Sequence, residues 1–403
     1  MKLGNAAAII GFGDAYADKD NKRDPLQLAT EATAIALADA DIKKTDVDTL
    51  FTGRAPWSDC RPQWNNIFAS HLQMPVKLST EVTFHGAGVN AMLGMAVEKI
   101  ATGQADYVLC VQSDATPLFV DTVAMGAATD ADPQFEYPYG PTIPALYAQW
   151  ACRYMHEFGV TEEDLAMVAV QHQDWGIHHP KAAKRRFGKI DIETVMNSPY
   201  IAAPLRRWMC ATWGPGGTAG AFIVASAEKA ASARAPIYIN GYGSYSTHEY
   251  LVERMALRNA PASLGALPNL TTTGLTEAAA QAYAMADMRP GDMDMVQLSG
   301  NFAHTVLMEL EDLGFAEKGK AMDLVRSGAM EPGGSLPVDT NGGWLSFGQP
   351  GISCTVDSIV EAMRQLRGDA MGLGVPDAER AIVYGGGGML ACHAVSILSN
   401  KAS

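Results

Sequence analysis

The chain has 403 residues, enough for one large core or for two fused domains. With 48% hydrophobic and 18% charged residues, its composition is that of an ordinary globular protein. The net charge of −14 argues against a general binder of nucleic acids. No stretch reaches the roughly 18 uninterrupted apolar residues of a membrane span, and the N-terminus lacks the features of a signal peptide.

The cysteines are scattered along the chain, with no CxxC pair and no metal-ligand spacing. We therefore expect reduced thiols and no metal site. Together with the missing signal peptide, this predicts a cytoplasmic protein.

The first half alternates strand and helix patterns. Residues 6–13 are a short apolar strand that ends in glycines, and residues 24–40 have the spacing of an amphipathic helix. Residues 46–51 begin a second strand, and residues 106–111 read as a buried strand. Alternation at this spacing predicts a layered α/β fold.

The second half repeats this order. Four landmarks of the first half recur in sequence: residues 237–243, residues 287–296, the turn 348–351 with the helix that follows it, and residues 381–385. We therefore predict a duplicated α/β unit with an N-terminal half, 1–233, and a C-terminal half, 234–403. The two turn–helix junctions are expected to converge on one site.

An insertion of about residues 116–199 interrupts the first half. It carries a capping box at residues 161–164, which predicts a helix start, and a basic cluster between residues 181 and 189. A second basic pair lies at residues 206–207. The insertion suits a lid or a substrate-binding segment, although a purely structural excursion and a solvated basic surface fit the pattern as well.

The junction at residues 79–100 is the most informative local pattern. A strand enters the turn His85-Gly86-Ala87-Gly88, and a helix of small residues leaves it. Enzymes use strand–turn–helix geometry of this kind to present a nucleophile. Here the residue at the turn is His85.

Three segments resemble the thiolase superfamily, specifically its sterol-carrier-protein-type thiolase and lipid-transfer branch. They are residues 333–350 with their paired glycines, residues 138–144 with 154–157, and the ending at residues 387–393. The resemblance covers essentially the full length. It implies a five-layer αβαβα fold, a homodimer, and acyl-CoA substrates in which coenzyme A is part of the substrate and no further cofactor is bound.

The catalytic residues of that family are replaced. His85 stands where the resemblance places the nucleophilic cysteine, and Gln349 stands where it places the histidine of a Gly-His-Pro motif. Ser299 and Gly300 replace the first two residues of a His-Asp-Cys-Phe or Tyr-Asp-x-Phe motif. The glycine run at residues 385–388 lacks the usual acid–base cysteine.

Some candidate catalytic groups remain. The positive end of the helix dipole would lower the pKa of His85, so that a neutral imidazole acts as a general base or as a donor to a thioester carbonyl. Filling of the vacated cysteine pocket is the alternative role for His85. Asn301 and Gln349 could donate hydrogen bonds to an enolate oxygen, and Ser299 and His304 complete the candidate set. The basic and turn residues expected to contact coenzyme A are Lys184, Arg185, Arg186 and Gly348.

Three functions fit this pattern. The first is a CoA-dependent carbon–carbon lyase that cleaves the side chain of a lipid, steroid or aromatic compound by non-covalent retro-aldol chemistry. The second is an acetyl-CoA acetyltransferase-type acyl transfer that uses an unexpected nucleophile. The third is a non-catalytic subunit that binds acyl-CoA. The resemblance also implies a small partner protein built from an OB-fold and a zinc ribbon.

Overall fold

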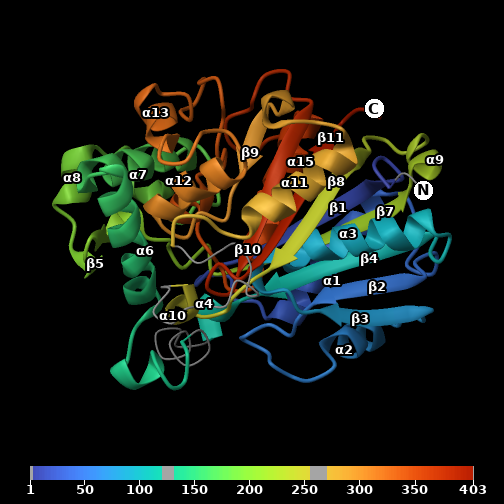
Figure 1. The fold of residues 1–403 in the computed structure, drawn as a ribbon. Helices are drawn as coiled ribbons and strands as arrows, with labels where there is room; N and C mark the ends of the chain where they lie inside the picture. Colours follow the sequence, from blue (N-terminus) through green and yellow to red (C-terminus); the bar gives the residue numbers. More distant parts are fainter. Residues whose placement is uncertain (1–2, 120–130, 255–269, 403) are drawn as a thin grey trace.

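A nine-stranded sheet runs through the computed structural model, which describes residues 3–119, 131–254 and 270–402 (Figure 1). Its strand order is β3-β2-β4-β7-β1-β8-β11-β10-β9. The strands are β1 (Ala7–Ala17), β2 (Thr49–Gly53), β3 (Leu78–Val82), β4 (Tyr107–Asp114), β7 (Gly217–Ser226), β8 (Ile237–Ser246), β9 (Met295–Gln297), β10 (Arg380–Gly387) and β11 (Cys392–Ser399). A separate small sheet contains β5 (Tyr200–Ala202) and β6 (Leu205–Arg206).

The two halves of the sheet repeat one pattern of strand pairing. In the first half, β1 pairs antiparallel with β7, β7 antiparallel with β4, and β4 parallel with β2. In the second half, β8 pairs antiparallel with β11, β11 antiparallel with β10, and β10 parallel with β9. A short antiparallel contact between β1 and β8 joins the halves. The predicted duplicated α/β architecture is confirmed.

Four helices complete the layers. Helix α1 (Pro25–Asp39) covers the outer face of the first half-sheet, and α11 (Leu275–Ala286) covers that of the second. Helices α3 (Gly88–Ala101) and α15 (Cys354–Arg367) lie between the halves and share one apolar core with strands of both. The order of layers is therefore αβαβα, and the central helix layer is buried on both sides.

Local sequence explains where several helices begin. Asp24 caps α1 in a reciprocal capping box with Gln27, and Pro25 lies in the first turn, where a missing N–H has no cost. Thr161 and Asp164 form the predicted capping box of α7 (Glu162–Gly176). Helix α2 spans Trp64–His71.

The insertion packs firmly onto the second half. Its helices α6 (Ile143–Phe158) and α7 share an apolar core with α12 (Ala303–Asp312) and α13 (Ala321–Arg326). Buried hydrogen bonds add to this contact, including one from Gln171 Nε2 to the carbonyl oxygen of Val325 at 2.7 Å. Helix α6 starts at Ile143 because the Thr142 side chain caps it. The other α-helices within the described part of the chain are α4 (Thr116–Phe119), α8 (Ile192–Met196), α9 (Ala227–Ala230), α10 (Leu251–Arg254) and α14 (Gly343–Ser346).

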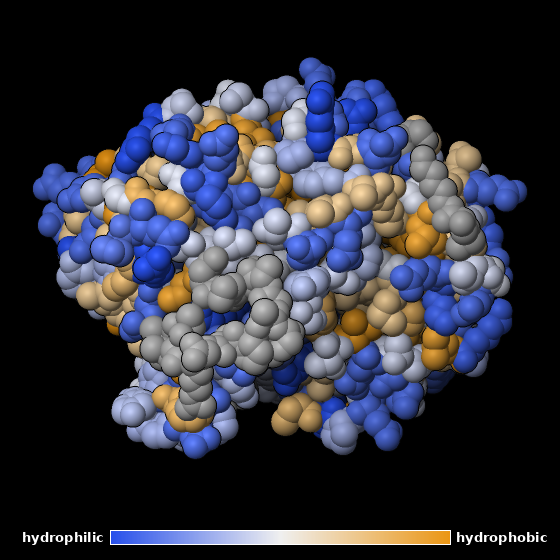
Figure 2. Space-filling model, in the orientation of Figure 1, coloured by the Kyte–Doolittle hydropathy of each residue, from blue (hydrophilic) through white to orange (hydrophobic). Residues whose placement is uncertain are grey.

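The surface is predominantly polar on the face shown in Figure 2, where hydrophobic residues are scattered and do not gather into one large patch. Among the described residues, no helix has both the length and the hydropathy needed to cross a membrane.

Asn90 links the two halves inside the central layer. Its Nδ2 donates to the carbonyl oxygen of Val383 at 2.9 Å and to Ser396 Oγ at 3.2 Å, and the side chain is buried. We expect Asn90→Ala to lower the free energy of unfolding by about 2 kcal/mol, because it leaves buried acceptors without a donor. Urea denaturation measures this change, and Asn66→Ala, at an exposed position of α2, is the matched control. Equal stability of the two variants would contradict this role of Asn90.

Candidate active site

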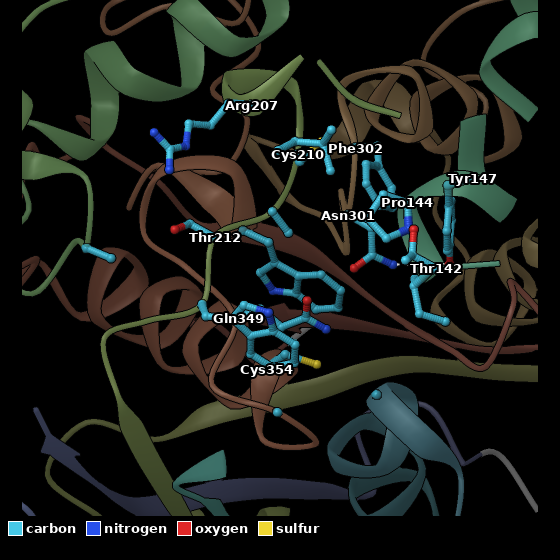
Figure 3. A pocket seen from close by; sticks show the side chains of 18 of the residues that line it. Thr142, Pro144, Tyr147, Arg207, Cys210, Thr212, Asn301, Phe302, Gln349 and Cys354 are labelled. Carbon is cyan, nitrogen blue, oxygen red and sulfur yellow. Dashed lines mark hydrogen bonds between the residues drawn. The ribbon is translucent and has the colours of Figure 1, made fainter. Parts of the chain in front are cut away.

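A cavity of about 1160 Å³ lies where the two predicted junctions and the insertion meet (Figure 3). His85 and Gly86 line it from the first half, and Gln349 and Cys354 line it from the second. Its other walls come from α6, the 183–213 segment, Asn301 and Phe302, and the glycine turn at residues 386–388. The aromatic lining residues are Trp57, Tyr147, Phe187, Trp208, Trp213, Phe302 and Trp344.

His85 begins a single 3₁₀ turn, His85–Ala87, that leads into α3. Its φ of +46° lies in the left-handed region, which costs a non-glycine residue about 1 kcal/mol. Two contacts hold the turn in this conformation. The Thr355 hydroxyl donates to the carbonyl oxygen of Gly86. Gly387 packs so closely against the turn that a Cβ on it would lie only 2.4 Å from the His85 Cβ. The two junctions therefore converge, as the duplication predicted.

Burial lowers the pKa of the His85 imidazole below its ordinary value, and the positive charge of Arg54 lowers it further. This agrees in direction with the sequence-based expectation but corrects its cause, which had been assigned to the helix dipole. A neutral imidazole at pH 7 can accept a proton or donate one hydrogen bond.

Gln349 and Cys354 lie together on one wall of the cavity (Figure 3), and a Cβ on Gly86, the residue after His85, would lie 3.2 Å from the Cys354 sulfur. The Gln349 backbone N–H donates to the carbonyl oxygen of Thr212 at 2.8 Å, which fixes the turn before α15. Burial raises the pKa of the Cys354 thiol to about 12, and that of Cys210, the other cavity thiol, to about 12. A thiol with that pKa is ionised in only about one molecule in 100,000 at pH 7. Neither cysteine is therefore an activated nucleophile.

Asp114, at the end of β4, connects two walls of the cavity. Its carboxylate accepts hydrogen bonds from the Ser58 hydroxyl at 2.8 Å and from the backbone N–H of Ile352 at 3.1 Å. It also accepts a longer bond, 3.3 Å, from the backbone N–H of Trp57. Burial raises the pKa of Asp114, although these donors oppose the shift. No local sequence pattern marks Asp114 as a site residue, because its partners lie far away along the chain.

Asn301 faces the cavity beside Tyr147 of α6 (Figure 3). The Asn301 Nδ2 donates to the Tyr147 hydroxyl oxygen at 3.3 Å. The Tyr147 ring packs against Phe302, with 4.6 Å between the ring centroids. This corner of the cavity thus combines an amide and a phenol in an aromatic surrounding.

Two of the proposed catalytic residues do not line the cavity. The Ser299 hydroxyl donates to the carbonyl oxygen of Tyr384 at 3.0 Å and accepts from the backbone N–H of Gly386 at 2.8 Å. His304 is fully buried on α12, where burial lowers its pKa to about 3. Ser299 therefore supports the glycine turn from behind, and His304 belongs to the packed core.

Some of the basic residues expected to contact coenzyme A line the cavity, and others do not. Lys184 and Arg186 line the cavity, and so does Arg207. Lys184 is buried over the Trp208 ring with its pKa lowered to about 8 by burial, so it is not part of a solvated surface cluster. Arg185 and Gly348 are not among the lining residues, and Arg185 donates to the carbonyl oxygen of Ile177 instead.

Tyr147 and Arg207 were not among the predicted site residues. Arg207 lay in a recognised basic pair, which was a usable signal. Tyr147 gave none, because an aromatic residue within a helical pattern is far more often part of a core.

Comparison with known proteins identifies relatives over the full length. The family model described as "Thiolase C-terminal domain-like" matches residues 258–400. The acetyl-CoA acetyltransferase of Methanothermobacter thermautotrophicus is 30% identical over 92% of this chain and 94% of its own. The 17-hydroxy-3-oxo-4-pregnene-20-carboxyl-CoA lyase of Mycobacterium tuberculosis is 32% identical over 96% of this chain and 98% of its own.

A branch within that superfamily is also indicated. Sterol carrier protein 2 of Bos taurus is 24% identical over 95% of this chain and 70% of its own. Among solved structures, one titled "Ltp2-ChsH2(DUF35) aldolase" superposes with a TM-score of 0.84 and 29% identity, covering both chains fully. The resemblance seen in the sequence is confirmed.

The environment of His85 predicts its titration. We expect the imidazole to titrate below the ordinary value of 6.5, and Arg54→Gln to raise its pKa because a cation that disfavours imidazolium is removed. NMR of selectively labelled histidine measures both values, with His85→Gln assigning the signal. Arg61→Gln, which removes an exposed arginine paired with Asp59, is the matched control and leaves the value unchanged. A His85 pKa above 6.5 in the unaltered protein would refute the assignment.

Proposed function

Because this chain belongs to the thiolase superfamily, in its sterol-carrier-protein-type branch, we propose that it is a CoA-dependent lyase that cleaves a carbon–carbon bond by retro-aldol chemistry. The observation that carries the proposal is the set of groups in the cavity. It contains an imidazole and two amides, His85, Gln349 and Asn301, and its two thiols have raised pKa values. Such a set can stabilise an enolate and move protons, but it lacks an ionised thiol to hold an acyl group.

The reaction begins with a β-hydroxyacyl-CoA. Loss of the hydroxyl proton forms the carbonyl of an aldehyde or ketone, and the electron pair of the Cα–Cβ bond moves into the thioester as an enolate. Protonation of the enolate at Cα then gives a shorter acyl-CoA, so that atoms and charge balance. Gln349 donates a hydrogen bond to the enolate oxygen. His85, which is neutral at pH 7, is the acid–base group that transfers the proton at Cα.

The cavity orients such a substrate. Arg207, Arg186 and Lys184 offer positive charge to the phosphates of coenzyme A. Arg207 lies on one side of the view in Figure 3 and Tyr147 on the other, and Gln349 and Cys354 lie below both. The aromatic residues of the lining favour an apolar, ring-bearing acyl group.

Acyl transfer is the second candidate, since one relative is named an acetyl-CoA acetyltransferase. It needs a nucleophile, and Cys354 is the thiol beside His85. The neutral His85 imidazole would have to ionise that thiol against the burial that raises its pKa. A non-catalytic acyl-CoA-binding subunit is the third candidate.

One set of assays separates these functions. With 3-hydroxy-3-phenylpropanoyl-CoA we expect benzaldehyde and acetyl-CoA, and no acyl adduct on the protein by mass spectrometry. His85→Gln should lower kcat by at least about 100-fold, the usual contribution of a positioned acid–base group. Cys354→Ser should retain most of the activity. An acyl adduct that disappears in Cys354→Ser would replace the lyase by the transferase, and binding without turnover would leave the third candidate.

We also propose that the chain forms a homodimer through strand β3. This strand is the outer edge of the sheet and pairs with β2 on one side. An edge strand exposes unpaired backbone groups that a second copy could pair with across a two-fold axis.

The dimer is tested by proline substitution. Light scattering should give twice the chain mass of 42.9 kDa. Successive N–H groups of a strand point to opposite sides, so one of the two positions Ser79 and Thr80 donates from the open edge. Of the variants Ser79→Pro and Thr80→Pro, the one that removes this donor should yield a monomer. Thr80→Ala keeps the donor and should stay dimeric. A monomeric unaltered chain would contradict the dimer.

The last proposal about assembly is that this chain works together with a second protein. The similar aldolase structure is titled as a pair, Ltp2 with ChsH2(DUF35). We expect this chain to work with a small partner of that type.

A further inference from the structure

Retro-aldol cleavage requires two proton movements, one at the β-oxygen and one at Cα. The proposed role of His85 accounts for the proton at Cα. A second group must therefore take the proton of the β-hydroxyl, on the side of the thioester that faces away from coenzyme A.

The layout of the cavity indicates where that group lies. A substrate whose phosphates meet Arg207 and whose thioester carbonyl meets Gln349 directs its β-carbon away from the basic end. In Figure 3 Asn301, Phe302 and Tyr147 form a corner of the cavity on the side of the view opposite Arg207. Tyr147 carries the hydroxyl of this corner, and it comes from the insertion rather than from either junction.

Two neighbours of Tyr147 favour negative charge on its oxygen. Asn301 Nδ2 donates to that oxygen at 3.3 Å. Arg254 is a fully buried cation whose guanidinium lies 5.7 Å from the centroid of the Trp150 ring, and the Tyr147 ring lies 5.1 Å from the same ring. Burial lowers the pKa of Arg254 to about 10, which leaves it charged at pH 7, and the phenols of Tyr147 and Tyr384 oppose this shift through their charges.

From this arrangement we infer that Tyr147 is the acid–base residue at the β-oxygen, which rests on the proposed lyase function. In cleavage, the Tyr147 phenolate accepts the hydroxyl proton and becomes a phenol, while the Cα–Cβ bond breaks, the β-carbon becomes a carbonyl, and the electron pair enters the thioester enolate. The Asn301 amide and the Arg254 cation stabilise the phenolate before this transfer, and the phenol then gives its proton to the enolate or to solvent, which restores the phenolate. Asn301 and Arg254 act through Tyr147 and are positioning residues.

The first test separates the two proton movements. Cleavage of 3-hydroxy-3-phenylpropanoyl-CoA reports on the β-oxygen, and deuterium exchange into the methyl group of acetyl-CoA in D₂O reports on Cα. We expect Tyr147→Phe to lower the cleavage rate at least about 100-fold and to leave the exchange within about twofold. His85→Gln should lose both. Tyr154→Phe is the matched control, because Tyr154 lies on the same helix but donates to Glu311, outside the cavity, and should change neither rate.

A second test does not depend on turnover. Measured in the His85→Gln background, which is expected not to cleave the substrate, the protein should bind the hydroxy compound about tenfold more tightly than 3-phenylpropanoyl-CoA, which lacks the hydroxyl, because one additional hydrogen bond is formed. Tyr147→Phe should remove this difference and leave the affinity for 3-phenylpropanoyl-CoA unchanged. Calorimetry measures the four dissociation constants.

The outcomes distinguish the inference from the function on which it rests. Cleavage by the unaltered protein together with near-normal cleavage by Tyr147→Phe would overturn the role of Tyr147 and leave the lyase intact. Loss of the exchange reaction in Tyr147→Phe would also overturn it. If the unaltered protein cleaves nothing, the lyase proposal fails, and the binding difference alone decides whether Tyr147 contacts the β-oxygen.

Discussion

Burial of two helices between the half-sheets is the constraint on which the site depends. Helices α3 and α15 contact strands of both halves, so their positions cannot change without opening the central core. Their N-terminal turns consequently meet, and the contact between Thr355 and Gly86 closes the junction. The strained backbone of His85 persists because this packing leaves it no other conformation. The positions of the cavity residues on these turns therefore follow from the way the two halves share one helix layer.

The same burial decides which chemistry the site can perform. A low-dielectric environment disfavours every charged form, so it raises the pKa values of the Cys354 and Cys210 thiols and lowers that of the His85 imidazole. All three groups are neutral at pH 7. Neutral donors and acceptors stabilise a charge that develops on the substrate, and enolate chemistry requires such stabilisation. Covalent thiol catalysis requires an ionised thiol instead.

The insertion supplies one wall of the cavity, which includes Tyr147 and Lys184. It is fixed to α12 and α13 by a shared apolar core and by buried hydrogen bonds such as that of Gln171, so it forms a permanent wall. Through Lys184 it brings positive charge to the end that suits coenzyme A phosphates, and through Tyr147 a polar group to the other. A duplicated scaffold can thus keep its core while the insertion changes what is recognised and how it reacts.

The sequence by itself determined the alternation of strands and helices, the duplication, the capping box at Thr161 and the turn at His85, because these are local or periodic patterns. It also identified Asn301 and Gln349 as cavity amides, through their place in a motif. Only the tertiary structure decided which side chains face the cavity. Residues far apart in the sequence make those contacts, as Asp114 and Ile352 do, and no pattern along the chain encodes them. For that reason Ser299, His304, Arg185 and Gly348 are absent from the cavity wall, while Tyr147, Arg207 and the supporting Asp114 emerged only from the packing.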